Sequence, residues 1–336
     1  MMWPLQGAEM TKGKTQWKEF LEAVSVLQWV LSFIFLGKIP PPHFPFLNME
    51  KPVITAASAV YSQHLSDNTA VTVTSGKTIF VRKWRVWKHF RDFFPVKLVK
   101  TAELSPNKNY ILGCHPHGIF SVGAFTCFST DSCGFAEVFP GVRPSLAILA
   151  GLFRIPFFRE YIMSAGLLPV SKPSIVNSLS KSGKGNAVVI VIGGAAESLE
   201  ASPGVHTIVV KQRKGFVRVA LELGADLVPV YSFGENALFK QVIFSESSLG
   251  RKLQDLFKNI MGFAPCLFVG EHFMFLPYRT PVTTVVGSPI SVPKCASPTE
   301  EEVDHYHKLY MEALSKLFHE HKVSCGLSES HELQIT

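Results

Sequence analysis

The sequence has little charge and no long hydrophobic run. Only 18% of its 336 residues are charged, and 47% are hydrophobic, whereas an average soluble domain has roughly 25% charged residues. This balance excludes an intrinsically disordered chain, which needs low hydrophobicity and high charge. No run approaches the ~20 uncharged apolar residues of a membrane-spanning helix, which argues against a polytopic membrane protein. One large domain or two small ones remain, with membrane contact without deep spanning as the first hypothesis.

Cysteines and the usual motif glycines are scarce as well. Six Cys are too sparse for a disulfide-built secreted domain, and none shows C-x-x-C spacing, so we expect reduced thiols and no metal site. No Walker or G-x-G-x-x-G loop follows a predicted strand, and the lack of a G-x-S-x-G elbow weakens a serine hydrolase. Four histidines near the C-terminus are interpreted as surface residues, because positions i and i+2 of a helix do not share a face: His305, His307, His319 and His321.

The first 79 residues are predicted to form a membrane-anchor and linker region. Ala23 to Gly37 contains no charged residue and would form about 22 Å of helix, short of a ~30 Å hydrocarbon core. We interpret it as an anchor or re-entrant helix; the alternatives are a signal sequence and a buried helix. Residues 38–79 begin with a proline-rich stretch that cannot continue a helix, and we interpret them as linker or irregular structure.

Positive charge is concentrated between Arg82 and Lys100. This segment holds seven bases and one acid, so +6 of the net charge of +7 lies there. Five aromatic residues fall at helical spacing on one face: Phe80, Trp84, Trp87, Phe90 and Phe94. Such a basic helix is typical of a membrane interface; the alternative is a helix packed on the core with a solvated basic side. No nucleic-acid motif accompanies the charge, so nucleic acid is not an expected partner.

From about residue 104, short β-like runs alternate with helical patterns. Strands are predicted at 110–112, 187–192, 227–233 and 283–286, and helices at 216–223 and after Thr299. The last helix begins with a capping box, Thr299 with Glu302, and has an apolar stripe of Val303, Tyr306, Tyr310, Leu314 and Leu317. The alternation predicts an α/β fold with a mostly parallel sheet.

Two histidines follow the first of these strands. His115 and His117 stand in a His-Pro-His-Gly sequence that ends at Gly118. Catalytic groups of open α/β sheets collect at the carboxyl ends of strands, and histidine is the usual general base near neutral pH. The alternative is a structural pair that caps a turn.

The second predicted strand is followed by Gly193, Gly194 and Glu197. The glycines allow close backbone approach. Glu197 would lie at the same sheet edge as the histidines, where a carboxylate can orient an imidazole and stabilise its charged form. The alternative is a solvated loop acid.

Two further loops contain candidate residues. Lys211, Arg213 and Lys214 precede a predicted helix and could hold phosphates; the alternative is a solvated helix start. The loop at 231–236 follows the third strand and contains Glu235, which we interpret as substrate lining or a plain turn.

Together these segments resemble the type 2 diacylglycerol O-acyltransferase family, which includes monoacylglycerol and wax-alcohol acyltransferases. The resemblance runs in unbroken order from about Trp84 to the C-terminus. It rests on FFPVKLVKTAELSPNKNYILGCHPHG, FPGVRP, REYIMSAG, VIGGAAES, RKGFVRVAL, ADLVPVYSFGEN, GFAPC and TTVVGSPI. It implies a glycerophosphate-acyltransferase-like domain over residues 80–336, with the basic helix at its start. It also implies an enzyme of the endoplasmic reticulum membrane with access to lipid droplets.

The resemblance implies transfer of a fatty acyl group from acyl-CoA to the hydroxyl of a neutral lipid, either diacylglycerol or monoacylglycerol. The alternatives are a wax-alcohol acyltransferase and a catalytically inactive lipid-binding relative. The expected partners are acyl-CoA, the lipid acceptor and a membrane surface, and a homo-oligomer stays open. No cofactor is expected, because acyl-CoA is a co-substrate.

The same resemblance assigns roles to the candidate residues. His115 or His117 would take the hydroxyl proton, and Glu197 would orient an imidazole. Substrate binding would involve backbone N–H groups that hold the oxyanion and cations that meet the coenzyme A phosphates: Gly118, Gly193 and Gly194, and Lys211, Arg213 and Lys214.

The sequence departs from related families at three places. The more distant glycerophosphate acyltransferases carry an Asp five residues after their His, where this chain has Phe120 or Val122, which makes Glu197 the natural orienting acid. The N-terminal hydrophobic hairpin of the family is reduced to Ala23–Gly37, and EHFMFLPY after Gly270 is shorter than the usual segment. The last two departures bear on membrane topology and on part of the substrate pocket.

Overall fold

The computed structural model describes residues 13–34, 81–155, 158–181, 183–245, 247–261, 263, 265–271 and 275–336. The predicted irregular linker at 38–79 lies outside these residues. The predicted anchor is described only as far as Ile34.

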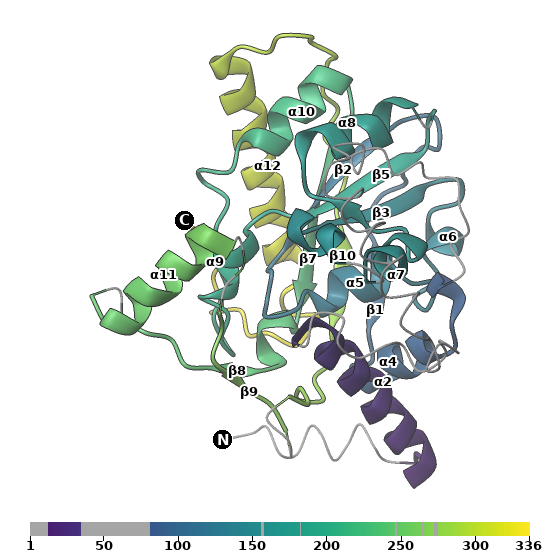
Figure 1. Cartoon of the computed structure of the whole chain (residues 1–336). Coiled ribbons are helices and arrows are strands. Elements are labelled where there is room, and N and C mark those ends of the chain that lie inside the picture. The colour runs from purple at the N-terminus through teal and green to yellow at the C-terminus, as the bar shows by residue number, and fades with distance from the viewer. Residues whose placement is uncertain are drawn as a thin grey trace, which may run out of the picture.

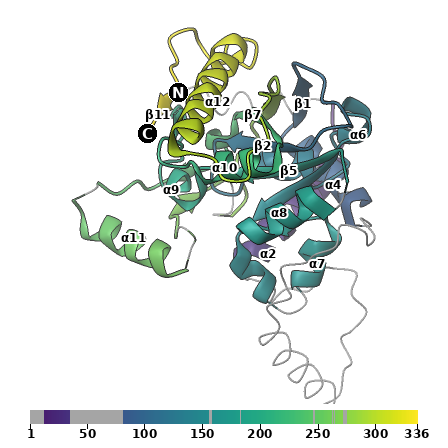
Figure 2. The same ribbon diagram turned by 90° about the horizontal axis from the view of Figure 1, so that it is seen from above.

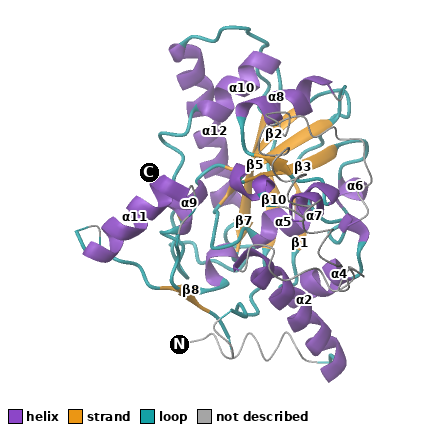
Figure 3. Cartoon of the chain, in the orientation of Figure 1, coloured by secondary structure: helices purple, strands orange, loops and turns teal. Residues whose placement is uncertain are grey.

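A sheet of seven strands forms the centre of the described chain (Figures 1 and 3). The strands are β1 (Lys97–Lys100), β2 (Tyr110–His115), β3 (Arg143–Ile148), β4 (Leu168–Pro169), β5 (Asn186–Val191), β6 (Thr207–Ile208), β7 (Asp226–Phe233), β8 (Lys240–Gln241), β9 (Phe268–Val269), β10 (Thr283–Val286) and β11 (Gln334–Ile335). The order in the large sheet is β1-β10-β7-β2-β5-β3-β4. Strands from β7 to β4 are parallel, and β10 runs antiparallel to β7. The predicted α/β fold with a mostly parallel sheet is confirmed.

Helices cover both faces of the sheet (Figure 2). They are α2 (Gln16–Ile34), α4 (Val86–Phe93), α5 (Val122–Phe128), α6 (Phe135–Val138), α7 (Phe158–Ser164), α8 (Lys172–Lys181), α9 (Gly194–Ser198), α10 (Gly215–Leu223), α11 (Leu249–Met261) and α12 (Glu300–His321), with short 3₁₀ turns at Val81–Lys83, Ala150–Arg154 and Glu235–Ala237. Successive residues of β2 alternate between two hydrophobic clusters: Leu112 packs with α2, α4, α5 and α7, and Ile111 packs with α8, α10 and α12. This alternation is the pleat of a strand buried on both faces.

The helix signals in the sequence are realised locally. The C-terminal neighbour of α10 is Gly224, which has a left-handed φ of 64°, the conformation that glycine favours at a helix end. At α12 the Thr299 side chain accepts from the Glu302 N–H, and the Glu302 carboxylate accepts from the Thr299 N–H, so the predicted capping box is confirmed. Most of the predicted stripe of α12 is buried, including Tyr310 and Leu314.

One of the four C-terminal histidines is not at the surface. His307 is buried, and its Nε2 lies 3.0 Å from the carbonyl oxygen of Val210. The surface interpretation is wrong there because His307 follows Val303 by four residues and precedes Tyr310 by three, which places it on the buried face of α12. Burial also lowers the pKa of His307.

The aromatic face of the basic segment lies in the core and not at a membrane interface. Trp87, Phe90 and Phe94 are buried, whereas Phe80 lies outside the described residues. Arg82 is also buried, with its Nε 3.1 Å from Asp131. The interfacial interpretation is therefore wrong for these rings, and the core-packed alternative holds: α4 has only eight residues, and its apolar face fills the space beneath β2.

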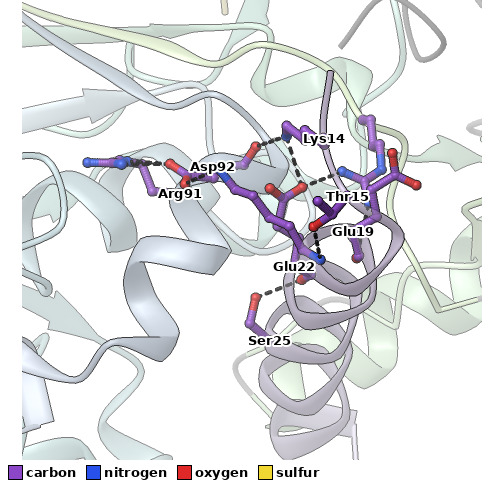
Figure 4. Close-up of polar contacts among 9 residues, drawn as sticks. Lys14, Thr15, Glu19, Glu22, Ser25, Arg91 and Asp92 are labelled. Carbon is purple, nitrogen blue, oxygen red and sulfur yellow. Dashed lines mark hydrogen bonds and ion pairs between the residues drawn. The ribbon is translucent and has the colours of Figure 1, made fainter. Parts of the chain in front are cut away.

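The described part of the predicted anchor, α2, packs on the domain. Trp29 of α2 lies against Phe90 of α4, with ring centroids 5.0 Å apart. Figure 4 shows the polar end of this contact: the buried Glu22 carboxylate accepts from Lys14 at 2.9 Å, and it also accepts from Arg279 at 2.7 Å. The buried-helix alternative therefore describes this segment. Within the described ranges, no helix is long and apolar enough to cross a membrane.

Candidate active site

Strand β2 delivers both histidines to the carboxyl edge of the sheet. His115 is its last residue and is fully buried, and His117 follows half-buried. β2 lies between β5 and β7, in parallel register with both; Cys114 pairs with Val191 and His115 with Tyr231. Because the carboxyl ends of parallel strands meet at one edge, the loops after β5 and β7 reach the histidines.

Glu197, in the short helix α9 after β5, is buried against both histidines. Its Oε1 accepts the main-chain N–H of His117 at 2.5 Å, and its Oε2 lies 3.5 Å from Nδ1 of His115. Oε2 also accepts the N–H of Val209 at 2.8 Å. The expected approach of Glu197 to the histidines is therefore present, and the acid is not a solvated loop residue. Its catalytic role stays a prediction.

The ring of His117 is held through one nitrogen. Its Nδ1 lies 3.1 Å from the carbonyl oxygen of Gly118 and 2.7 Å from Oγ of Ser198. Since a carbonyl oxygen can only accept, Nδ1 is assigned the proton, and Nε2 keeps a free lone pair. Burial lowers the pKa of His117, against the opposing charge of Glu197. A neutral imidazole with a free lone pair can act as a general base.

His115 is enclosed more completely. Its Nε2 is buried and has no hydrogen-bond partner among the described residues, which is uncommon for a buried polar atom. Its Nδ1 faces Glu197. The two histidines thus flank one carboxylate, which can stabilise positive charge that arises on an imidazole during proton transfer.

Two of the predicted glycines make room for carboxylates. A Cβ at Gly193 would collide with Oε2 of Glu197, and a Cβ at Gly118 would lie 2.7 Å from Cγ of Glu235. Gly118 and Gly194 also have positive φ values, 58° and 55°, which favour glycine. An oxyanion role for these backbone groups stays a prediction.

Glu235 is the residue whose place the sequence reasoning missed. The side chain is buried, and its carboxylate accepts the N–H groups of Val122 and Gly123 at 2.7 and 2.8 Å. Burial raises the pKa of Glu235 to about 7, although these two N–H groups act in the opposite direction. The available signal was positional: Glu235 is an acid directly after the third predicted strand, as Glu197 is after the second.

The basic cluster lies one step away from the site. Lys211 and Arg213 are exposed, and Lys214 forms an ion pair with Asp304 at 2.5 Å. No contact between these side chains and the histidines occurs in the described chain. The cluster is nevertheless continuous with the site, because Val209, two residues before Lys211, donates its N–H to Glu197.

The described residues contain no group of three His, Cys, Asp or Glu side chains placed to hold a metal ion. The six cysteines are free, and burial raises the pKa of Cys114, which adjoins His115. The arrangement of a buried carboxylate between two imidazoles can take up a proton and return it.

Comparison with known proteins links this site to a family. A family model described as diacylglycerol acyltransferase matches residues 59–336. Diacylglycerol O-acyltransferase 2 is 50% identical in Xenopus tropicalis, covering 94% of this chain and 89% of the relative, and 48% identical in Homo sapiens, covering 94% and 82%. Human 2-acylglycerol O-acyltransferase 3 is 48% identical over 95% of each chain. A crystal structure of a 1-acyl-sn-glycerophosphate acyltransferase from Thermotoga maritima covers 93% of this chain and 97% of its own at 12% identity, with a TM-score of 0.41, which is too low to carry an argument.

Proposed function

Because the chain belongs to the diacylglycerol acyltransferase family, we propose that it transfers a fatty acyl group from acyl-CoA to the hydroxyl of diacylglycerol or monoacylglycerol. The products are triacylglycerol or diacylglycerol, and free coenzyme A. The observation that carries this proposal is the contact of buried Glu197 with both histidines of the His-Pro-His-Gly sequence.

His117 is the base in this mechanism. It is half-buried, so an acceptor can reach it, whereas His115 is fully enclosed. Nε2 of His117 takes the proton of the acceptor hydroxyl while the oxygen attacks the thioester carbonyl. The C–S bond then breaks, and the coenzyme A thiolate leaves and takes up the proton from His117. Glu197 stabilises the imidazolium through this cycle.

The substrate-binding roles follow from position. The N–H groups near Gly118, Gly193 and Gly194 are the candidates for holding the oxyanion of the tetrahedral intermediate. Lys211 and Arg213, exposed just after the loop that contacts Glu197, are suited to the phosphates of coenzyme A. No cofactor takes part in these steps.

The decisive experiment measures acyl transfer by purified full-length protein in detergent micelles. Labelled acyl-CoA is offered with diacylglycerol, monoacylglycerol and hexadecanol side by side. We expect labelled glycerolipid products, and about a 10²- to 10⁴-fold lower kcat for His117→Ala. His115→Ala should cost less, and His305→Ala, an exposed residue of α12, should leave the rate unchanged.

Three outcomes would change the assignment. Labelled ester formed only with hexadecanol would identify a wax-alcohol acyltransferase. Folded protein that consumes no acyl-CoA would identify an inactive lipid-binding relative. Full esterification in both histidine variants and in the double variant would refute the proposed chemistry.

The acceptor is insoluble in water, so the enzyme must meet a lipid surface, and α11 is the element best suited to it. Its apolar residues fall on one face of the helix and are exposed: Leu249, Leu253, Leu256, Phe257 and Ile260. Figure 1 shows α11 standing away from the sheet. The helix also carries three bases and one acid, and an exposed amphipathic basic helix is suited to a membrane interface.

The short strands at the base of α11 extend this apolar surface. Val242 and Ile243 follow β8, and Leu267 precedes Val269 of β9; all four are exposed. With the aromatic rings of α4 buried, α11 and this base replace the 82–100 segment as the proposed membrane contact. We place the enzyme at the endoplasmic reticulum membrane and at lipid droplets on the same grounds.

Vesicle flotation tests the membrane contact. Full-length protein freed of detergent is mixed with phosphatidylcholine vesicles, with and without phosphatidylserine. Replacement of Leu253, Leu256 and Ile260 by Ser should lower the bound fraction. The matched control replaces Val170 and Val323, which are exposed on other elements, and should bind as the native protein does. Equal flotation of the triple variant would contradict the role of α11.

A further inference from the structure

Glu235 joins the end of β7 to the turn that follows the histidines. Its side chain is 2% exposed. Both carboxylate oxygens are used: Oε1 accepts the N–H of Val122 at 2.7 Å, and Oε2 accepts the N–H of Gly123 at 2.8 Å. These are the first two residues of α5, so a side chain from one strand-end loop fixes the helix that follows another.

The same side chain also packs against the beginning of that turn. Gly118 lies so close to Glu235 that a Cβ there would be 2.9 Å from Oε1. The turn between these two contacts is closed by Ser121, whose N–H donates to the carbonyl oxygen of His117 at 3.0 Å. Glu235 therefore holds the turn at both ends.

The orientation of His117 depends on this turn. Nδ1 of His117 lies 3.1 Å from the carbonyl oxygen of Gly118, which belongs to the residue that packs on Glu235. A shift of Gly118 would turn that carbonyl group away and release the imidazole. Such a release would misplace Nε2 with respect to an acceptor hydroxyl, without any direct contact between Glu235 and substrate.

A buried acid is an expensive spacer. Among the residues that the structure describes, no cation forms an ion pair with Glu235, and two neutral N–H groups are its hydrogen-bond partners. Burial of a carboxylate without a cation is unfavourable, whereas a residue needed only to fill space would be apolar. Two strong acceptors on one side chain are what the geometry requires, since a carboxylate offers two oxygens and an amide only one.

From these contacts we infer that Glu235 is a positioning residue for acyl transfer: it sets the direction of the His117 imidazole by holding residues 118–123. This inference rests on the proposed function, in which His117 is the base. Glu235 itself does not touch the reacting atoms.

The test compares Glu235→Gln with Asp226→Asn. Asp226 begins the same strand, β7, is also buried, and binds Lys108 and Ser291 at the far end of the sheet from the histidines. Both substitutions replace a buried carboxylate by an amide of the same shape. We expect Glu235→Gln to lower kcat about 10- to 100-fold, as a misplaced catalytic group does, with little change in KM for acyl-CoA. Asp226→Asn should lower Tm while kcat stays at the native value.

Two results would overturn the inference. One is a native kcat in Glu235→Gln; the other is a loss of kcat that Asp226→Asn reproduces at equal Tm. If Glu235→Gln does not fold, Glu235→Asp decides, because it keeps both acceptors and the charge but withdraws them by one methylene group. A lower kcat in folded Glu235→Asp supports positioning, and a native kcat refutes it.

A second readout separates this inference from the function itself. The native protein is assayed in the same experiment, and its failure to transfer acyl groups would count against the proposed function. The NMR signal of a ¹³C-labelled His117 ring then still reports on positioning. A changed chemical shift in Glu235→Gln, but not in Asp226→Asn, supports it; an unchanged shift refutes it.

Discussion

Glu197 and His117 are joined through the main chain: the carboxylate accepts the N–H of His117 at 2.5 Å, while the imidazole is held separately by Gly118 and Ser198. The acid therefore fixes where the second histidine leaves β2. Its other oxygen faces the ring of His115. One carboxylate thus sets the positions of both candidate bases.

Replacement of Glu197 by Gln should lower kcat by about 10²-fold or more, because an amide cannot serve both N–H donors and cannot stabilise an imidazolium. Steady-state assays with saturating acyl-CoA would measure this. The control is Glu200→Gln, three residues further on and ion-paired with Arg251, which should keep kcat within about twofold because surface ion pairs contribute little. Equal rates in the two variants would contradict the role of Glu197.

The attachment of α2 should depend on Glu22. Replacing Glu22 by Gln leaves Arg279 partly buried without its carboxylate, and breaking a buried ion pair from one side costs about 3–5 kcal/mol. We expect faster hydrogen exchange over residues 16–34 in this variant. Lys18→Gln removes only a more exposed pair with Asp92 and should change the free energy of unfolding by less than about 1 kcal/mol. Identical exchange in both variants would show that the apolar face alone holds α2.

Gly113 should not tolerate a side chain. A Cβ there would collide with the hydroxyl of Tyr310, which donates to the carbonyl oxygen of Gly113 at 3.0 Å. Overpacking of this kind costs about 1–3 kcal/mol. Thermal unfolding should give a lower Tm for Gly113→Ala, with partial recovery in the double variant with Tyr310→Phe, which removes the colliding oxygen. Additive losses in the double variant would exclude this clash as the cause.

Stability should depend on pH through Glu235. Its pKa is raised in the folded state from 4.5 to about 7, so the folded protein binds this proton more tightly than the unfolded chain does. The stabilisation is complete below pH 4.5 and is lost as the pH rises toward 7, by up to about 1.4 kcal/mol per pH unit. The buried histidines have lowered pKa values, so their contribution to stability changes in the opposite direction.

A difference measurement isolates the contribution of Glu235. Denaturant unfolding of the native protein and of Glu235→Gln at pH 5 and pH 7 cancels the histidine contributions, because both proteins contain them. The native protein should lose stability relative to the variant between the two pH values. The same difference at both pH values would mean that Glu235 does not titrate in this range.

Strands and caps were predictable because they depend on local residues. The run 283–286 coincides with β10, and the box at Thr299 forms as its residue types require. Glu197 could be placed near the histidines because parallel strands bring their carboxyl ends to one edge. Glu235 reaches the same edge, but its hydrogen bonds to α5 depend on where another loop turns, which no local pattern specifies.

The N-terminal segments were misjudged for a different physical reason. The apolar helices α2 and α4 carry the same composition whether they face lipid or each other, so hydrophobicity alone does not choose between the two. The interlocked rings of Trp29 and Phe90 decide it. Conversely, α11 attracted no attention in the sequence, because its charges hide a stripe that only the folded arrangement leaves uncovered.

Gln241 anchors the excursion that contains α11. Its amide donates to the carbonyl oxygens of Ser198, Leu199 and Ala201, and the thiol of Cys266 at the returning end lies 3.6 Å from the same Ser198 oxygen. The chain thus departs from α9 and comes back to it, and β8 pairs with β9 across the two ends. Such a closed base makes the excursion a module: relatives could lengthen, shorten or exchange it, and so adapt to different lipid surfaces, while Glu197 keeps its place.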